Sequence, residues 1–195
     1  ALFEEVAKRI LDEMVRKDLV SGNETFLEYY IPQILNGKDM GMIDKVIAEE
    51  LPKLKKCFNK KVIANVSGFS IEEYAYTCEK LDKEEQVGIL EVNVSCPNVH
   101  NGGMSFGTLP ESAAEVTKAV KAVTKKPVYI KLSPNVTDIV SIAKACEEAG
   151  ADGISLINTL LGMRIDLKSK KPVIANKMGG FSGSAIKPVA IRMVY

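Results

Sequence analysis

The sequence is short of several residue types, and each shortage narrows what the protein can be. It has no tryptophan, one histidine and four cysteines, and it contains no CxxC pair. Because histidine, cysteine and acidic residues do not cluster, a catalytic metal is not expected. The cysteines are widely spaced, which is typical of reduced thiols in a cytoplasmic protein. Cys57, Cys78 and Cys146 are expected to be small core or surface residues.

A large charge of either sign is also missing. Lysine and arginine total 26 against 25 aspartate and glutamate, a formal net charge of +1, so neither a nucleic acid nor a membrane surface is an expected partner. No apolar run has the length of a bilayer span. The opening stretch ALFEEVAKRILDEM carries acidic residues where a secretory signal would carry basic ones. What remains is a chain of 195 residues, enough for one domain with a substantial core.

After the first sixty residues, short apolar runs alternate with amphipathic stretches. Strands are predicted at residues 61–66, 88–94, 127–132 and 153–158. Capping boxes predict two of the intervening helix starts, Ser70 with Glu73 and Thr108 with Glu111, and Gly150 ends the third helix. Strands this apolar are usually covered on both faces. Repeated βαβ units in a parallel sheet are therefore expected.

Residues 1–60 differ in character and are predicted to be helical. Helices are expected at residues 3–14, 26–35 and 43–54, the second of them kinked by a proline. The chain is interpreted as a single domain, residues 1–195. In that domain a helical segment of uncertain origin, residues 1–60, precedes the βα units of residues 61–195.

Polar side chains gather where the four predicted strands end. They are Asn65 and Ser67 at the first strand, Asn93, Ser95, Cys96 and Asn98 at the second, Lys131 and Ser133 at the third, and Asn158 with Thr159 at the fourth. Each has another explanation, because asparagine is common in turns and a lysine can simply reach solvent. In a parallel α/β barrel, however, chemistry takes place at the carboxyl ends of the strands. The coincidence over four strands favours a shared site.

The composition of this rim indicates the kind of ligand. Carboxamides offer donors and acceptors on one group, so they suit a planar heterocycle that bears carbonyl and N–H groups. A single cation among them suits an electron-rich ring that gains negative charge. His100, the only histidine, lies in the loop after Cys96 and is expected to be solvated.

Three longer stretches carry a family resemblance. They are EVNVSCPNVHNGGMSFGT, PVYIKLSPNVTDIVSIAKACEEAGADGISLINTL and GMRIDLKSKKPVIANKMGGFSGSAIKPVAIRMVY. From about Gly41 to Tyr195 the chain resembles dihydroorotate dehydrogenase. The form SCPNVHNGG is similar to the class 1B branch, which works with an iron–sulfur and FAD subunit and passes electrons to NAD. The resemblance implies a (β/α)8 TIM barrel that holds FMN and oxidises dihydroorotate to orotate in pyrimidine biosynthesis.

The resemblance also implies roles for single residues. Cys96 matches the base that removes the C5 proton of dihydroorotate, while a hydride passes to FMN. Flavin contacts are implied for Asn65, Asn93, Lys131, Ile157 and Gly183, and substrate contacts for Asn93, Asn98, Asn158 and Thr159. The chemistry agrees, because a free thiol titrates at about pH 8.5 and a nearby cation favours its thiolate.

Two segments depart from the family pattern. Residues 1–40 resemble none of the family's opening strands, and the sequence ends before the family's last βα units, which grip the FMN phosphate. The 195 residues alone are therefore expected to form a partial barrel that holds FMN weakly. An open parallel sheet would leave an edge strand unpaired, so a homo-oligomer is expected. Two alternatives stay open: a truncated or engineered half-barrel without activity, and another FMN-barrel oxidoreductase acting on a different pyrimidine.

Overall fold

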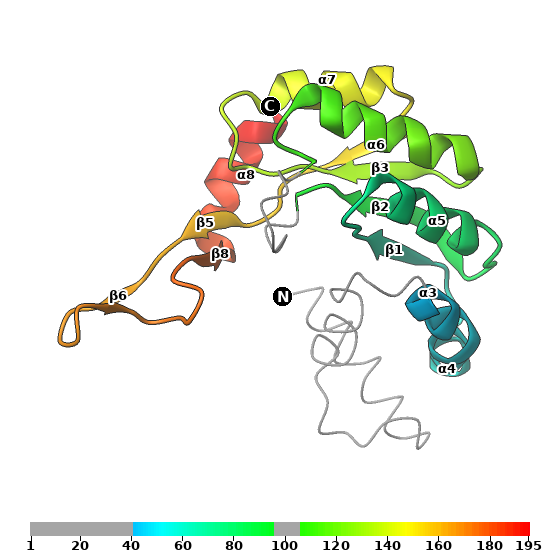
Figure 1. The fold of residues 1–195 in the computed structure, drawn as a ribbon, viewed down its shortest axis with the longest axis horizontal. Helices are drawn as coiled ribbons and strands as arrows, with labels where there is room; N and C mark the ends of the chain where they lie inside the picture. Colours follow the sequence, from blue (N-terminus) through cyan, green and yellow to red (C-terminus); the bar gives the residue numbers. More distant parts are fainter. Residues whose placement is uncertain (1–40, 96–105) are drawn as a thin grey trace.

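The centre of the fold is a parallel sheet with helices on one side. The structure, a computed structural model, describes residues 41–95 and 106–195. Its main sheet has the order β1-β2-β3-β4 and every pairing is parallel. The strands are β1 (Val62–Val66), β2 (Val87–Asn93), β3 (Val128–Lys131) and β4 (Gly153–Ser155). Between them run the helices α5 (Ile71–Asp82), α6 (Pro110–Val123) and α7 (Ile139–Glu148), which form one layer (Figure 1). The predicted α/β alternation is confirmed for this part of the chain.

The two faces of this sheet carry different residues. One row of the face toward the helices aligns Val66, Val92 and Ile130, each at most 2% exposed. The residues that alternate with them point to the opposite face, where Ile63 is 61% exposed. Among the described residues the helices therefore cover one face, whereas the sequence predicted cover on both. The other face carries polar side chains at the carboxyl ends of the strands.

Local sequence explains where α5 and α7 begin. The Ser70 hydroxyl accepts a hydrogen bond from the Glu73 N–H at 3.3 Å, and the Glu73 carboxylate accepts one from the Phe69 N–H at 2.7 Å. The predicted cap by Ser70 is confirmed, whereas the Glu73 carboxylate bonds to the N–H one residue before the N-cap that a capping box would use. At α7, the Asp138 carboxylate accepts from two backbone N–H groups of the first turn. Gly150 follows the end of that helix with φ of +99°, a conformation that favours glycine.

The capping box predicted at the start of α6 is wrong. The N-cap position of α6 is Leu109 rather than Thr108, and the Leu109 side chain provides no cap hydrogen bond. The reason is Pro110 in the first helical position. Its ring fixes φ near the helical value and it has no N–H to satisfy, so the helix begins there without a side-chain cap.

Upstream of the sheet the predicted helix at residues 43–54 is confirmed. It consists of α3 (Gly41–Lys45), a π-helical turn η1 (Val46–Glu50) and α4 (Leu51–Cys57). Ile43, Ile47 and Leu51 recur on one side of it and pack against the core. The helices predicted at residues 3–14 and 26–35 lie outside the described residues.

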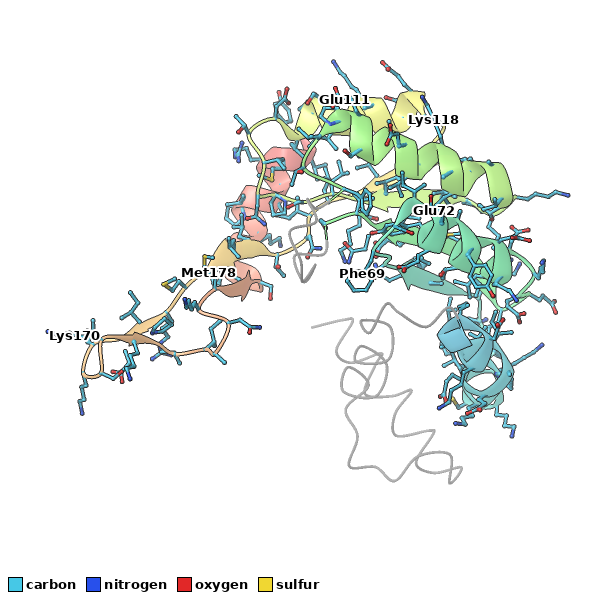
Figure 2. The ribbon with its side chains drawn as sticks, in the orientation of Figure 1. Phe69, Glu72, Glu111, Lys118, Lys170 and Met178 are labelled. Carbon is cyan, nitrogen blue, oxygen red and sulfur yellow. The ribbon has the colours of Figure 1, made fainter. Side chains whose placement is uncertain are left out.

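Downstream of β4 the structure contains an arm that the sequence analysis did not predict. The fourth strand ends at Ser155 rather than at residue 158. Two antiparallel pairs follow: β5 (Leu160–Gly162) with β8 (Gly179–Phe181), and β6 (Ile165–Asp166) with β7 (Lys171–Pro172). This ribbon extends away from the main sheet, and the chain returns through η2 (Ser184–Ile186) to α8 (Lys187–Val194) (Figure 1). Lys170 and Met178 are labelled along it in Figure 2.

Asp82, at the end of α5, ties that helix to the segment before β3. One oxygen of its carboxylate accepts hydrogen bonds from the Thr124 hydroxyl at 2.5 Å and from the N–H groups of Lys125 and Lys126 at 2.8 and 3.2 Å. The bond from Thr124, opposed by some desolvation, is the main cause that lowers the pKa of Asp82. The folded state therefore favours the ionised carboxylate.

We expect Asp82→Asn to lower the free energy of unfolding by about 1–2 kcal/mol at pH 7, because a charged acceptor of three hydrogen bonds is lost. Since the folded pKa is depressed, this contribution is complete above the unfolded pKa of about 3.9 and disappears as the pH falls through the folded pKa. Denaturant titrations of parent and variant at neutral and acidic pH measure the difference. Glu85→Gln, an exposed neutralisation, is the control. A difference that stays constant with pH would contradict the assignment.

Candidate functional site

The residues predicted for the site lie on the face of the sheet that the helices leave uncovered. In the register of the strands, Asn65 of β1 is opposite Glu91 of β2, and Asn93 of β2 is opposite Lys131 of β3. All four side chains project to the same side, because residues two apart on a strand share a face. Three neighbouring strands thus contribute polar groups to one surface.

The first group of contacts joins Asn65, Glu91 and Lys131. The Asn65 amide nitrogen donates to one oxygen of the Glu91 carboxylate at 2.6 Å, and the Lys131 ammonium lies 3.6 Å from that same oxygen. The sequence analysis assigned no role to Glu91. The signal was present, since Glu91 precedes Asn93 by two residues on a predicted strand and so shares its face.

The second group ties the end of β2 to the segment after β4. The Asn158 amide nitrogen donates to the Asn93 carboxamide oxygen at 3.2 Å and to the Ser95 hydroxyl at 2.5 Å. The Ser95 N–H also donates to that Asn93 oxygen, at 3.2 Å. Ser95 is buried; the sequence analysis placed it at the strand end but gave it no role. These bonds fix Asn93 through its oxygen, so its NH₂ group is the one available to a ligand.

Thr159 is held by its neighbours on two sides. Its N–H donates to the Asn158 carboxamide oxygen at 2.7 Å, and its carbonyl accepts from the Asn135 amide nitrogen at 3.0 Å. Gly180 of β8 lies against its side chain: a Cβ on Gly180 would be 2.8 Å from the Thr159 Cβ, closer than packed atoms approach. The arm therefore contacts the site through Gly180, at a position where a larger residue would collide with Thr159.

The remaining predicted residues fall in different places. Ile157 is half-buried next to Asn158. Gly183 is the N-cap of η2 with φ of +96°, and a Cβ there would meet no described atom within 4 Å. The structure does not bring it into contact with the groups above. Cys96 and Asn98, with His100, lie outside the described residues, directly after Ser95.

The other thiols of the chain are placed unlike a catalytic base. Cys78 is fully buried in the core, and burial raises the pKa of its thiol to about 12. Burial also raises the pKa of Cys146. Cys57 is half-buried, and its thiol donates to the Leu54 carbonyl. The expectation that these three are core or surface residues is confirmed, and Cys96 stays the residue predicted to transfer the proton.

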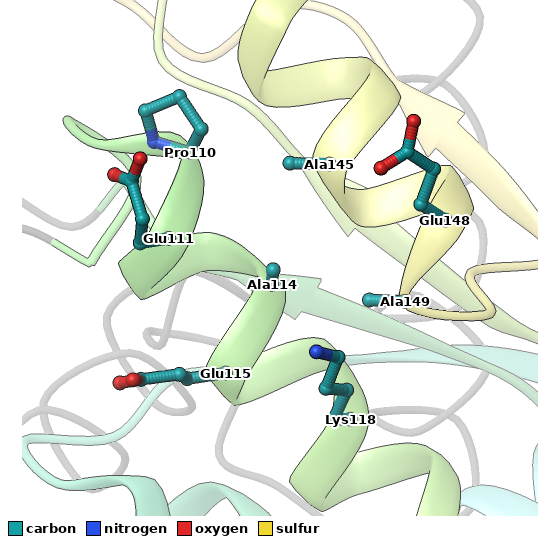
Figure 3. Close-up of a pocket in the computed structure, with 8 residues that line it drawn as sticks. All are labelled: Pro110, Glu111, Ala114, Glu115, Lys118, Ala145, Glu148 and Ala149. Atoms are coloured by element: carbon teal, nitrogen blue, oxygen red, sulfur yellow. The ribbon is translucent and has the colours of Figure 1, made fainter.

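A shallow groove on the opposite side of the molecule is separate from this site. It lies between α6 and α7, on the outer surface of the helix layer (Figure 3). The residues that line it are Pro110, Glu111, Ala114, Glu115, Lys118, Ala145, Glu148 and Ala149. None of them lies at the carboxyl end of a strand, so the groove is not the candidate site.

Residues 41–95 and 106–195 contain neither a cluster of metal ligands nor a membrane-spanning helix. No group of three or more histidine, cysteine or acidic side chains is placed to hold a metal ion there. Within the same residues, no helix has the length and apolar character to cross a membrane.

The donor set of the site fits a flavin ring. Asn65, Asn93 and Asn158 supply carboxamides, and Lys131 supplies the cation of this face. Carboxamides pair with the carbonyl and N–H edges of a flat heterocycle, and an ammonium stabilises negative charge that such a ring gains. A phosphate, in contrast, is usually held by a helix N-terminus and glycine-rich turns, which this cluster does not contain.

A parallel sheet with alternating helices and polar groups at the carboxyl ends of its strands places the protein in the class of parallel α/β proteins, which includes the barrels. The sequence model of dihydroorotate dehydrogenase matches residues 35–195. The chain belongs to this family, whose fold is the TIM barrel, and the predicted fold class is confirmed for the part of the barrel described.

Individual relatives agree with this assignment. The "Dihydroorotate dehydrogenase B (NAD(+)), catalytic subunit" of Anoxybacillus flavithermus is 58% identical over 153 residues, which are 78% of this chain and 49% of that protein. The protein of the same name from a Geobacillus species is 59% identical with the same coverage. The one from Enterococcus faecalis is 58% identical over 152 residues, 78% of this chain and 49% of the relative. The chain spans about half the length of the curated relatives it matches.

Proposed function

We propose that the protein oxidises dihydroorotate to orotate in pyrimidine biosynthesis, with FMN as its cofactor. The observation that carries the proposal is the hydrogen-bonded group of Asn93, Ser95 and Asn158, which joins two strand ends directly before Cys96. This group holds the Asn93 carboxamide in one orientation, and Cys96 follows Ser95 directly in the sequence. A pyrimidine ring offers the carbonyl and N–H groups that such a carboxamide recognises.

In this proposal Cys96 removes the proton from C5 of the substrate. Asn93, Asn98, Asn158 and Thr159 hold the pyrimidine ring. Since the Asn93 oxygen is engaged by Asn158 and Ser95, its NH₂ group donates to a ring carbonyl. These residues bring the reacting C5–H bond to the thiolate, which is the condition for general base catalysis.

The cofactor would lie on the face of the sheet that α5, α6 and α7 leave uncovered. Asn65, Asn93 and Lys131 would contact its ring, Ile157 would contribute a backbone contact, and Gly183 would contribute a turn at the start of a helix. When bound, FMN supplies a hydride acceptor. Lys131 would stabilise negative charge on that ring.

The proposal extends to the assembly of the protein. Residues 1–195 would form one partial barrel domain with a helical segment at residues 1–60. The relatives are named as the catalytic subunit of an enzyme designated NAD(+), which implies a further subunit. The resemblance to the class 1B branch makes that subunit an iron–sulfur and FAD protein that would carry electrons onward. We expect a homo-oligomer, because the open sheet β1-β2-β3-β4 has edge strands that a second copy could pair with. The widely spaced thiols suit a cytoplasmic location.

Extraction of the flavin and a substrate comparison test this function. Mass spectrometry of the released cofactor should identify FMN, and the protein should turn over dihydroorotate but not dihydrouracil, which lacks the carboxylate. A preference for dihydrouracil would favour another FMN-barrel oxidoreductase. Failure of the protein to bind flavin or turn over either compound would favour the inactive half-barrel.

Gly180→Ala is expected to weaken substrate binding. The new methyl group would displace Thr159, which is assigned to the substrate and lies against Gly180. We expect KM for dihydroorotate to rise about tenfold, the effect of one lost hydrogen bond of about 1–1.5 kcal/mol, with a smaller change in kcat. Steady-state kinetics measure both constants. Gly88→Ala is the matched control, since its Cβ would meet the flexible Lys61 side chain. Unchanged kinetics in Gly180→Ala would contradict the placement of Thr159.

A further inference from the structure

Glu91 is a carboxylate in the middle of the face assigned to the flavin. It lies on β2 between Asn65 of β1 and Lys131 of β3, and its side chain is 21% exposed. One of its oxygens accepts from the Asn65 amide nitrogen at 2.6 Å and lies 3.6 Å from the Lys131 ammonium. A single carboxylate thus contacts two residues that are expected to hold the cofactor ring.

We propose that Glu91 is a positioning residue that fixes the orientation of the Asn65 carboxamide and offsets the charge of Lys131, and thereby sets the preference of the site for the reduced over the oxidised flavin. This inference rests on the proposed function, because it concerns the same cofactor. It adds a residue to which neither the family motifs nor the relatives' names assign a role.

The orientation argument follows from the direction of the hydrogen bond. A carboxylate only accepts hydrogen bonds, so it must face the NH₂ group of Asn65 and not the carboxamide oxygen. A bond of 2.6 Å to a charged acceptor is short and strong. The Asn65 oxygen is consequently left as the group that accepts a hydrogen bond from a ligand N–H.

The charge argument follows from the distance to Lys131. At 3.6 Å the ammonium and the carboxylate attract each other, but the separation exceeds that of a charge-assisted hydrogen bond. The pair therefore acts mainly through its charges. Lys131 favours a ring that gains negative charge, and the nearby carboxylate opposes the same gain. The net preference for the reduced ring depends on both residues.

Two substitutions separate the orienting effect from the charge effect. Glu91→Gln keeps a carbonyl oxygen that can accept from Asn65 but removes the negative charge. Glu91→Ala removes both. Glu115→Gln is the control, because it removes a carboxylate from the exposed outer surface of α6 (Figure 3). All variants are made in the full chain and purified with added FMN.

The first measurement is the flavin midpoint potential. Removing one nearby charge changes the equilibrium constant between two charge states about tenfold, which is the equivalent of one pKa unit. Glu91→Gln is therefore expected to favour the reduced flavin about tenfold more than the parent does, a shift of about 30 mV to more positive potential for a two-electron couple. A potential equal to that of Glu115→Gln would overturn the charge argument.

The second measurement is the NMR spectrum of the Asn65 side-chain amide, which requires no flavin. Its proton resonances should keep their hydrogen-bonded position in Glu91→Gln and lose it in Glu91→Ala. In the same Ala variant the affinity for oxidised FMN should fall about threefold to tenfold, because Asn65 is released. An Asn65 amide that is unchanged in Glu91→Ala would overturn the orientation argument.

The failure of this inference can be told from the failure of the proposed function. A parent protein that binds FMN and oxidises dihydroorotate, with Glu91 variants equal to the control in both measurements, refutes the role of Glu91 alone. A parent that binds no flavin refutes the proposed function. In that case the amide spectrum still decides whether Glu91 orients Asn65.

Discussion

Replacement of Cys96 by alanine is expected to abolish oxidation of dihydroorotate while the flavin stays bound. In the proposed mechanism this thiol transfers a proton and does not hold the cofactor. Removal of a general base typically costs 10²–10⁴-fold in rate, so kcat should fall by about that factor. Steady-state turnover gives kcat, and the flavin absorbance of the same sample gives the cofactor content.

The position of Cys96 supports this expectation. It directly follows Ser95, which is buried and hydrogen-bonded to Asn93 and Asn158. Cys57→Ala is the control, because that thiol is half-buried at the end of α4 and donates to a backbone carbonyl. A Cys96→Ala protein that turns over at the parent rate would show that another group removes the proton.

Lys131→Ala is expected to weaken flavin binding and to shift the midpoint potential to more negative values. The ammonium projects from β3 onto the face assigned to the ring, where it favours the form that carries more negative charge. Loss of one charge at short range should reduce the preference for the reduced form by about tenfold. Equilibrium dialysis measures FMN affinity, and redox titration measures the potential.

Lys118→Ala, on the outer surface of α6 and labelled in Figure 3, is the matched control for Lys131. It removes the same charge from the far side of the sheet and should change neither quantity. The sign of the potential shift should be opposite to that of Glu91→Gln, because one substitution removes a cation and the other an anion. A potential unchanged in Lys131→Ala would exclude this residue from the surroundings of the flavin.

The regular part of the fold could be predicted from the sequence because its signals are local. Alternating apolar runs and helical periodicity predicted the four parallel strands and the helices between them. Side-chain caps such as Ser70 and Asp138 act within one turn of their own helix. The start of α6 was predicted one residue too early. Pro110 takes the first helical position, so the N-cap falls on Leu109 and not on Thr108.

The arm could not be predicted in the same way. Its strands are two or three residues long and pair across the ribbon, for example Leu161 with Gly180. Segments this short contain too little alternation to distinguish a strand from a loop. The close approach of Gly180 to Thr159 depends on that pairing, so no local pattern indicated it.

The sequence predicted which polar residues lie near one another, but not their contacts. Asn65, Asn93, Lys131 and Asn158 stand at strand ends, and parallel strands bring their carboxyl ends to one edge. The hydrogen bonds between these groups could not be predicted from the sequence. The role of Glu91 depends on the register between β1 and β2, which places it opposite Asn65 and is not visible in either strand alone.

Anaerobic mixing of the flavin-loaded protein with dihydroorotate tests the central claim most directly. The account predicts that the flavin absorbance of the parent is bleached in a single turnover with formation of one equivalent of orotate, and that Cys96→Ala, with the same flavin content, is bleached at least a hundredfold more slowly. A chemical reductant should bleach both equally. A parent protein whose bound flavin responds to the chemical reductant but not to dihydroorotate would contradict the account.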